Sequence, residues 1–487
     1  MKKGSVIKNY IYNLTYQILV LILPLITTPY VSRVLGVENI GIYSYTLSIA
    51  SYFIMFGSLG IALYGQREIA YYQKDRKKYS HIFFEIILLR MLTMSISLLV
   101  FYNIFVNGNQ YQVYYKILML EIIGNCIDIS WFFQGMEEFK KTVMRNMLVK
   151  LISVVCIFSF VKTSSDLKIY FLIYVLSILI GNGTLWLYLP KYLEKIKLKE
   201  LYIFRHLKPT IALLIPQIAI QVYTLLDRTM IGTIILDKSE VGYYDQSQKI
   251  IKMLLAIITS LGTVMLPRIA STFANGEKEK VTGYMHKSFN MFFLLAFPMV
   301  FGIIAVSKSF VPVFFGNGYD KVAILMSIIS PIILLIGLSN VTGTQYLLPT
   351  KRQKEYTLSV VFGAIVNFIM NACLIWKYGA IGASIGTVIA ETVVTCVQLF
   401  FVRNDFDLKN IFALTRKYLC SSLIMFMICV MIEKMINNNL ISVIVQVVVG
   451  GATYGICLLC MRDKFLFEIL NKVKNKIFRK QKINDKL

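Results

Sequence analysis

The sequence predicts an all-α membrane protein that crosses the bilayer many times. Apolar runs of about 20 residues recur from end to end, and a helix of that length spans the hydrocarbon core at about 1.5 Å rise per residue. We find about 14 such runs and therefore expect about 14 transmembrane helices. The runs are Ile11–Val31, Gly41–Tyr64, Ile86–Val106, Tyr114–Phe133, Thr142–Val161, Ile169–Leu189, Thr210–Leu226, Val241–Leu266, Tyr284–Val306, Ala323–Leu347, Tyr356–Trp376, Ala380–Val402, Tyr418–Met435 and Leu440–Cys460.

Positive charge gathers in alternate connections between these runs and predicts the orientation. Of the 51 Lys and Arg residues, 37 lie in one alternate set of connections together with the two terminal segments. Basic loops stay in the cytoplasm, so we expect both termini to be cytoplasmic. The net charge of +25 would suggest nucleic acid in a soluble protein, but here it faces anionic headgroups and predicts no nucleic-acid partner. Trp131, Trp186 and Trp376 lie near run ends, which is typical of side chains at the membrane interface.

Two parts of the chain match at an offset of 201 residues. Gly41–Tyr43 aligns with Gly242–Tyr244, and in each copy an Arg, Arg67 or Arg268, follows the last Tyr after 24 residues. The first six runs then correspond to runs seven to twelve, which predicts a parallel repeat about an axis along the membrane normal. The basic segment at 191–208 would link the two copies, and we expect it to form an amphipathic helix on the cytoplasmic face. The predicted organisation is an N-terminal six-helix bundle at 1–190, a cytoplasmic basic linker at 191–208, a C-terminal six-helix bundle at 209–402, two additional transmembrane helices at 403–461 and a basic cytoplasmic tail at 462–487.

Polar side chains inside the apolar runs are candidate functional residues, because a charge there costs at least about 2.5–3.5 kcal/mol against lipid. Asp245, Lys249 and Lys252 have the spacing of one helical face. The matching positions in the second run include Ser44 and Ser48, which also share a face. We expect both faces to line a cavity between the halves. A local ion pair between Asp245 and Lys249 near the membrane surface is the alternative.

A second polar face lies in the fourth run. Glu121, Asn125 and Asp128 share one side of the expected helix, and Arg90 lies in the preceding run. An arginine–carboxylate pair that holds the bundle together and a role in binding substrate both remain open.

Charged residues also mark the ends of the first and seventh runs. Arg33 ends the first run, and Asp227 and Arg228 end the seventh at the matching place. A Na⁺ or H⁺ coupling site at Glu121, Asp128 or Asp227 is compatible with the sequence, but no motif specifies one.

Motifs of catalysis and metal binding are missing from the sequence. The eight Cys residues lie within or beside apolar runs, and the pair Cys457 and Cys460 has no second pair, so packing explains them better than metal or redox chemistry. No phosphate-binding loop, zinc-protease motif or serine-hydrolase elbow is present. We therefore expect no enzyme activity, no metal and no cofactor.

Several stretches resemble bacterial polysaccharide flippases of the multidrug/oligosaccharidyl-lipid/polysaccharide exporter superfamily. The resemblance runs over nearly the whole chain, and the stretch from Trp131 to Phe139 is its most specific part. The matching pieces are Thr28–Gly36, Gly41–Tyr43, Tyr64–Ala70, Trp131–Phe139, Gly379–Ala383 and Glu391.

This resemblance implies a V-shaped pair of six-helix bundles that works by alternating access. The cargo would be an undecaprenyl-diphosphate-linked oligosaccharide, moved from the cytoplasmic to the outer leaflet of the bacterial plasma membrane for surface polysaccharide synthesis. Polysaccharide polymerase and chain-length proteins would be partners. Positively charged side chains that line the central cavity would bind the diphosphate of the cargo. The residues of this chain that could do so are Arg33, Arg90, Arg228, Lys249 and Lys252.

Two other functions stay open. One is a cation-coupled exporter of drugs or other small molecules on the same fold, although a cavity rich in Lys and Arg suits lipophilic cations poorly. The other is a membrane oligosaccharide polymerase, which usually needs a large external loop. The expected external connections are all short, and this argues against the enzyme.

Overall fold

A computed structural model describes residues 3–468 and residue 471, and all regular structure in that part of the chain is helical. The chain forms two compact units, Met1–Asp245 and Gln246–Leu487, whose boundary falls inside one long helix, α9. Most of the predicted basic tail lies outside the described residues, as do residues 1–2.

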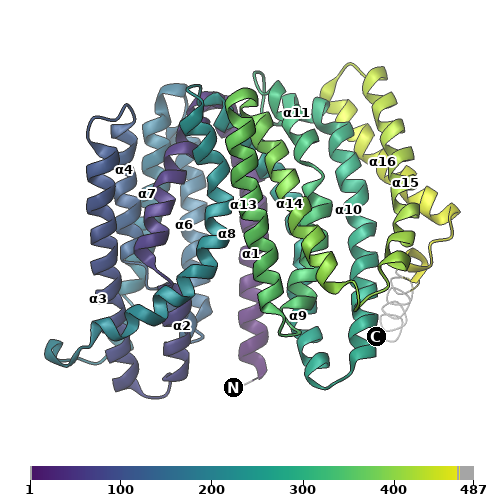
Figure 1. Ribbon diagram of the computed structural model, residues 1–487. Helices are drawn as coiled ribbons and strands as arrows, with labels where there is room; N and C mark the ends of the chain where they lie inside the picture. Colours follow the sequence, from purple (N-terminus) through teal and green to yellow (C-terminus); the bar gives the residue numbers. More distant parts are fainter. Residues whose placement is uncertain (1–2, 469–470, 472–487) are drawn as a thin grey trace, which may run out of the picture. The chain divides into compact units, whose positions relative to one another are not determined.

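The first unit contains helices α1 to α8 and the start of α9 (Figure 1). Three single-turn 3₁₀ segments connect α7 to α8. The helices are α1 (Lys3–Ser58), α2 (Ile61–Tyr71), α3 (Arg76–Phe101) with a π-helical turn η1 (Tyr102–Val106), α4 (Gln112–Cys126), α5 (Ser130–Gly135), α6 (Phe139–Phe160), the turn η2 (Ser164–Asp166), α7 (Leu167–Trp186), α8 (Leu207–Ile234) and α9 (Ser239–Ala274).

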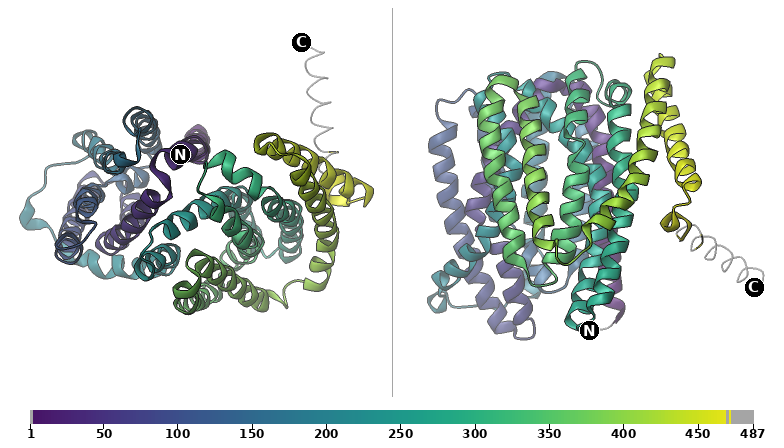
Figure 2. Two further views of the ribbon diagram at one scale, coloured as in Figure 1. Left: turned by 90° about the horizontal axis from the view of Figure 1, so that it is seen from above. Right: turned by 45° about the vertical axis from the view of Figure 1, so that its right-hand side comes forward.

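The second unit contains the rest of α9 and helices α10 to α16. Within it, α15 and α16 pack against α10 and are the two helices expected beyond the repeat (Figures 1 and 2). The helices are α10 (Lys278–Phe314), α11 (Asp320–Ile329), α12 (Ile332–Ser339) with the π-helical segment η6 (Asn340–Leu347), α13 (Gln353–Tyr378), α14 (Ala380–Val402), α15 (Leu408–Met435) and α16 (Asn439–Cys460).

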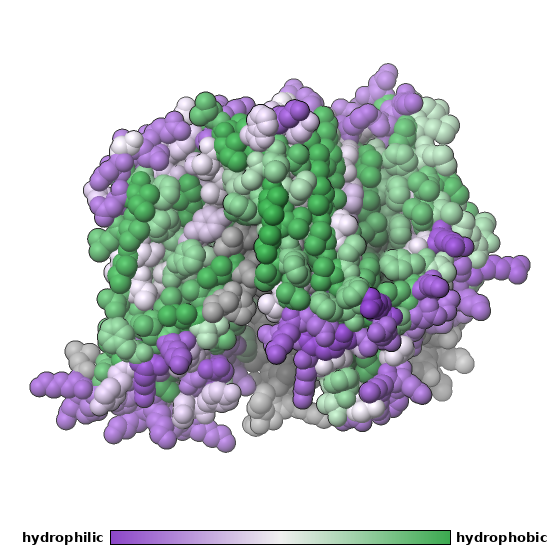
Figure 3. All heavy atoms as spheres, in the orientation of Figure 1, coloured by the Kyte–Doolittle hydropathy of each residue, from purple (hydrophilic) through white to green (hydrophobic). Residues whose placement is uncertain are grey.

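The helices confirm the predicted all-α membrane fold. Twelve helical segments among the described residues are long and apolar enough to cross a membrane. One of them, Ile22–Tyr71, includes parts of two predicted runs, and α8 covers the predicted run at Thr210–Leu226, so the expected number is compatible with the structure. Apolar side chains cover the middle of the helices in each unit, and hydrophilic side chains cover their ends (Figure 3).

Gly36 separates the first two predicted spans within α1. Its φ of 76° and ψ of 167° are not helical, so α1 consists of two helical parts that meet in a kink at Gly36. A positive φ of this size is costly for any residue with a Cβ, so glycine suits this position. A Cβ at Gly36 would meet no atom within 4 Å, so the requirement comes from the backbone and not from crowding.

The two glycines that match at the repeat offset pack against each other's helices. A Cβ built on Gly41 in α1 would lie 1.7 Å from the carbonyl oxygen of Lys238, and one on Gly242 in α9 would lie 2.2 Å from that of Val37. Val37 and Lys238 are themselves 201 residues apart. The two contacts exchange when the offset is applied.

The linker after α7 differs from the prediction. It forms the short turns η3 (Leu189–Lys191), η4 (Leu198–Glu200) and η5 (Ile203–His206) and contains no amphipathic α-helix. Side chains of α3 bind its backbone instead: Arg76 Nε donates to the Tyr192 carbonyl at 2.8 Å, and so does the Tyr79 hydroxyl at 2.8 Å. These bonds occupy carbonyl oxygens that a helix would have used.

Trp131 is not the interfacial side chain that we expected. It is 1% exposed, stacks on Phe83 with ring centroids 5.6 Å apart, and packs over Gly65, where a Cβ would lie 2.4 Å from the indole. The family-like stretches Tyr64–Ala70 and Trp131–Phe139 therefore form one core between α2 and α5. Trp376, by contrast, is 67% exposed, as the prediction requires.

Candidate functional site

Polar side chains of α1, α8 and α9 meet within the first unit. Arg228 in α8 forms an ion pair with Asp245 in α9, at 2.6 Å between Nη2 and Oδ1. Asp245 is buried, while Arg228 keeps about a fifth of its side chain exposed (21%). The Tyr244 hydroxyl donates to Asp227. The structure thus pairs Asp245 with the arginine one helix away, a contact that sequence spacing does not suggest.

The serine face of α1 contacts protein in this structure. Ser44 and Ser48 are both buried, and the Ser48 hydroxyl is 2.9 Å from that of Thr229 in α8. Ser48 also donates to the carbonyl of Tyr45 at 2.7 Å. The expected polar stripe exists, and it lies at a helix contact.

The remaining predicted cations are less buried than Asp245. Arg33 is exposed on α1, three residues before the break at Gly36. Lys249 is half-buried and Lys252 is exposed on the part of α9 that belongs to the second unit. Their assignment to cargo binding stays a prediction.

The second predicted polar face holds the end of α4 in place. Arg90 in α3 is 3% exposed; its Nε donates to the Asn125 carbonyl at 3.0 Å and its Nη2 lies 3.9 Å from an Asp128 carboxylate oxygen. Asp128 also accepts from the amide of Ser130, the first residue of α5, at 2.9 Å. Arg90 thus contacts the end of α4 within the bundle, and a role for it in binding substrate stays a prediction.

Glu121 is the member of this face with the fewest partners. The Tyr174 hydroxyl of α7 donates to Oε1 at 3.1 Å, and the Asn125 side chain donates to the main-chain oxygen of Glu121 at 3.0 Å. The carboxyl group is 4% exposed.

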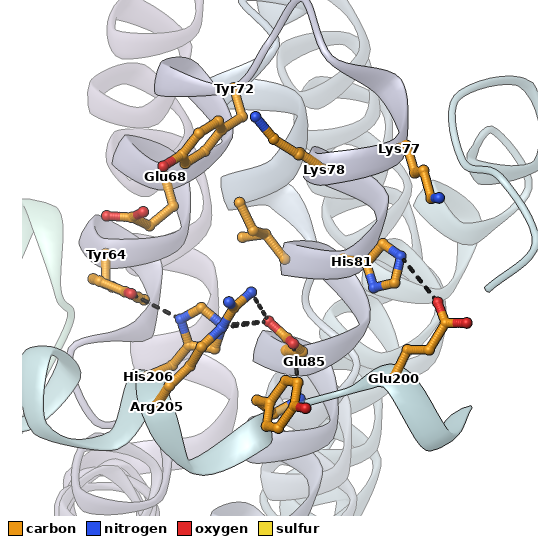
Figure 4. Close-up of a pocket in the computed structure, with 12 residues that line it drawn as sticks. Tyr64, Glu68, Tyr72, Lys77, Lys78, His81, Glu85, Glu200, Arg205 and His206 are labelled. Atoms are coloured by element: carbon orange, nitrogen blue, oxygen red, sulfur yellow. Dashed lines mark hydrogen bonds and ion pairs between the residues drawn. The ribbon is translucent and has the colours of Figure 1, made fainter. Parts of the chain in front are cut away.

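A cavity of about 660 Å³ lies where the linker meets α2 and α3 (Figure 4). Glu85, buried in α3, forms its floor and accepts from the amide of Tyr202 at 2.8 Å, from the Arg205 guanidinium at 2.9 Å, and from His206 Nε2 at 2.7 Å. An ionised carboxylate only accepts, so Nε2 carries the proton and Nδ1 accepts from the Tyr64 hydroxyl at 2.7 Å.

Our sequence reasoning missed this cluster. Glu85 precedes a predicted apolar run by one residue, and none of the three histidines is among the predicted site residues. Two features of the sequence could have indicated the cluster. Glu85 is a carboxylate at the edge of one predicted span, and Arg205 and His206 lie shortly before the start of another. The described residues contain no group of three or more His, Cys, Asp or Glu side chains that could hold a metal.

This all-α fold, with buried polar pairs inside apolar helices, is shared with solved membrane transporters. It is similar to the lipid II flippase MurJ in its inward closed conformation, with a TM-score of 0.73 at 17% identity over 94% of this chain and 99% of that one. It is also similar to an inward-facing multidrug resistance MATE transporter, with a TM-score of 0.61 at 13% identity over 81% and 96% of the two chains.

Residues 6–273, more than half of the chain, match the family described as "Polysaccharide biosynthesis protein", and the chain belongs to that family. Among characterised relatives, it is 28% identical to the "Putative O-antigen transporter" of Escherichia coli (strain K12) over 416 residues. That alignment covers 83% of this chain and 98% of the relative. The resemblance inferred from the sequence is confirmed.

Proposed function

We propose that this protein is a flippase for an undecaprenyl-diphosphate-linked oligosaccharide, carried from the cytoplasmic to the outer leaflet of the bacterial plasma membrane by alternating access. The observation that carries the proposal is the similarity to an O-antigen transporter over nearly the whole length of that relative. The cargo would feed surface polysaccharide synthesis, and polysaccharide polymerase and chain-length proteins would act on it after transport.

The chemistry of the cargo explains the cations that the sequence places within or beside apolar helices. A lipid-linked diphosphate sugar has an anionic head, a polar glycan and an apolar tail. Guanidinium groups match diphosphate oxygens in a planar fork, so Arg33 and Arg228 are the proposed diphosphate contacts, with Lys249 and Lys252 as further point charges. Outward movement of each negative charge gains about 2.3 kcal/mol per 100 mV when the inside is negative.

The decisive experiment locates the precursor in a deletion strain. Lipids are extracted from right-side-out vesicles before and after digestion with an external glycosidase. We expect full-length precursor that is protected from the enzyme, because a flippase neither builds nor cleaves the glycan. A truncated or missing precursor would instead indicate an assembly enzyme.

The MATE-like fold leaves a drug exporter as the second candidate. In that case the precursor would be digested as fully as in the parent strain, and deletion would change sensitivity to lipophilic cations instead of surface glycan.

The role of Arg228 can be separated from its ion pair. Arg228→Ala removes the ion pair with the buried Asp245, which harms the fold as well as any cargo contact. The double variant Arg228→Ala with Asp245→Asn removes that charge and should regain abundance in the membrane but not glycan export. Lys308→Ala, which removes an exposed cation paired only loosely with Glu433 at 4.0 Å, is the matched control and should export normally. Export regained by the double variant would show that Arg228 serves only Asp245.

The predicted orientation of the chain in the membrane can be tested by cysteine labelling. Both termini and the linker at 191–208 should be cytoplasmic, so cysteines placed at Asn107, Asp237 or Asn317 should be labelled from outside and one at Asn275 should not. These variants must be made in a protein from which the eight native cysteines have been removed, since four of them are exposed. Labelling of Asn275→Cys in intact cells would reverse the orientation.

A further inference from the structure

Glu121 is a buried carboxyl group with an incomplete set of partners. Tyr174 satisfies Oε1, but Oε2 has no hydrogen-bond partner, and no Lys, Arg or His among the described residues forms an ion pair with Glu121. The residue lies in the middle of α4, which is part of a segment long and apolar enough to span a membrane.

The charged and titratable groups around Glu121 come from three packed helices. Tyr43 from α1 and Tyr174 from α7 interact with Glu121, and Tyr170 of α7 lies beside Tyr43. Arg90 from α3 is directed to the Asn125 carbonyl and to Asp128, which lie further along α4. The tyrosines are neutral and Arg90 pairs with Asp128, so no described residue of this shell forms an ion pair with Glu121.

An ionised carboxylate in such a place is costly. Desolvation of an unpaired ion costs several kcal/mol even after the protein relaxes, and a buried acid avoids that cost by taking up a proton. Burial without a charged partner therefore favours the protonated form of Glu121 in the conformation described here. The proton comes from bulk water and can return to it when the carboxyl group becomes hydrated.

An aromatic cluster links this acid to the polar contacts of α8 and α9. Tyr43 lies with its ring centroid 4.9 Å from that of Tyr170 and 5.7 Å from that of Tyr174. Tyr43 and Tyr170 also interact electrostatically with Asp245, the partner of Arg228. Tyr43 follows Gly41 by two residues, so it lies beside the contact between α1 and α9.

We propose that Glu121 is the proton-binding residue that couples transport to a proton gradient: it is protonated while α1, α4 and α7 pack as described here, and it releases the proton in a conformation that admits water to α4. This inference rests on the proposed transport function. Acidification should favour the described conformation, and alkalinisation should favour the hydrated one.

The test measures conformation without cargo, so that it stays separate from the identity of the cargo. The purified full-length chain is placed in proteoliposomes, and hydrogen exchange of α4 and α7 is followed against pH, corrected for the intrinsic rate. Between the two protonation limits, one proton per transition changes the opening equilibrium by about tenfold per pH unit. Glu121→Gln should remove this dependence and Glu121→Asp should keep it.

Two controls make the outcome specific. Asp128→Asn alters the neighbouring carboxylate on the same face and should leave the pH dependence unchanged. Infrared difference spectra should contain a protonated carboxyl band that is lost in Glu121→Gln. An unchanged pH dependence in Glu121→Gln, or a band that persists in it, would overturn the assignment. Loss of both signals together with normal glycan export would keep Glu121 as a proton site and remove its coupling to this cargo.

Discussion

Two buried glutamates in the first unit have the same exposure and opposite surroundings. Glu85 is 1% exposed and accepts from a backbone amide, a guanidinium and an imidazole. Glu121 is 4% exposed and accepts from one tyrosine hydroxyl. Donors that favour the charged form keep a carboxylate ionised, and burial without them favours the neutral acid. Burial alone therefore does not decide what a membrane glutamate does; the number and type of its donors decide it.

This difference also separates structural from functional roles. Glu85 ties the linker to α2 and α3 through Tyr202, Arg205, His206 and, beyond His206, Tyr64. A site with all its bonds made resists change. Oε2 of Glu121 has no hydrogen-bond donor among the described residues, and such a carboxyl group can change its charge when its surroundings change.

The largest expected effect is that of Glu85→Gln. The amide would present hydrogens to Arg205, which has no lone pair to accept them, while His206 could adapt by changing its tautomer. We expect a loss of about 3 kcal/mol in stability, at the lower end for a broken buried pair because Arg205 is half-exposed. Thermal unfolding of the purified protein measures it. A loss below about 1 kcal/mol would mean that Glu85 does not hold the linker.

Tyr174→Phe should have a smaller effect. It removes the one hydroxyl that donates to Glu121 and leaves the ring packing intact, so we expect a loss of about 1 kcal/mol, the typical value of one hydrogen bond. Thermal unfolding of this variant beside Tyr170→Phe, which makes no such bond to Glu121, separates the hydrogen bond from general loss of a hydroxyl. Equal losses in both variants would speak against a specific bond.

The contribution of His206 to the stability of the folded protein should depend on pH. Burial, which outweighs the neighbouring Glu85, lowers the pKa of His206 below its usual 6.5. As the pH falls, this histidine is protonated in the unfolded chain before it is protonated in the folded chain. The stability that neutral His206 contributes is therefore complete above about 6.5 and is lost as the pH falls through its lowered pKa. Unfolding curves of wild type and His206→Gln against pH measure this, and parallel curves would contradict it.

The smallest expected effect on stability is that of Glu121→Gln. Gln has nearly the same shape as the protonated acid and keeps an oxygen for the Tyr174 hydroxyl, so we expect a change within about 0.5 kcal/mol. The same substitution at Glu85 should cost several times more. Equal costs at the two sites would erase the distinction between them.

The sequence predicted the helices better than it predicted the contacts between them. Each apolar run is mostly helical, because a run of that length in lipid must satisfy its own backbone hydrogen bonds. Arg90 and Asp128 were recognised as a candidate pair and do approach each other. Trp131 was misassigned to the interface, because its place near a run end gave no sign that α5 folds back into the core at Phe83 and Gly65.

The sequence by itself determined the all-α membrane fold and its family, because hydropathy, charge and short motifs are properties of local segments. Only the tertiary structure decided which buried charges are satisfied. Glu85 finds its donors more than a hundred residues away in the linker, and Arg228 finds Asp245 on the next helix. Among the described residues, the Glu121 carboxyl group accepts a hydrogen bond from Tyr174 alone. The cost of a buried charge depends on atoms within a few ångströms in space, and a linear pattern does not specify those neighbours.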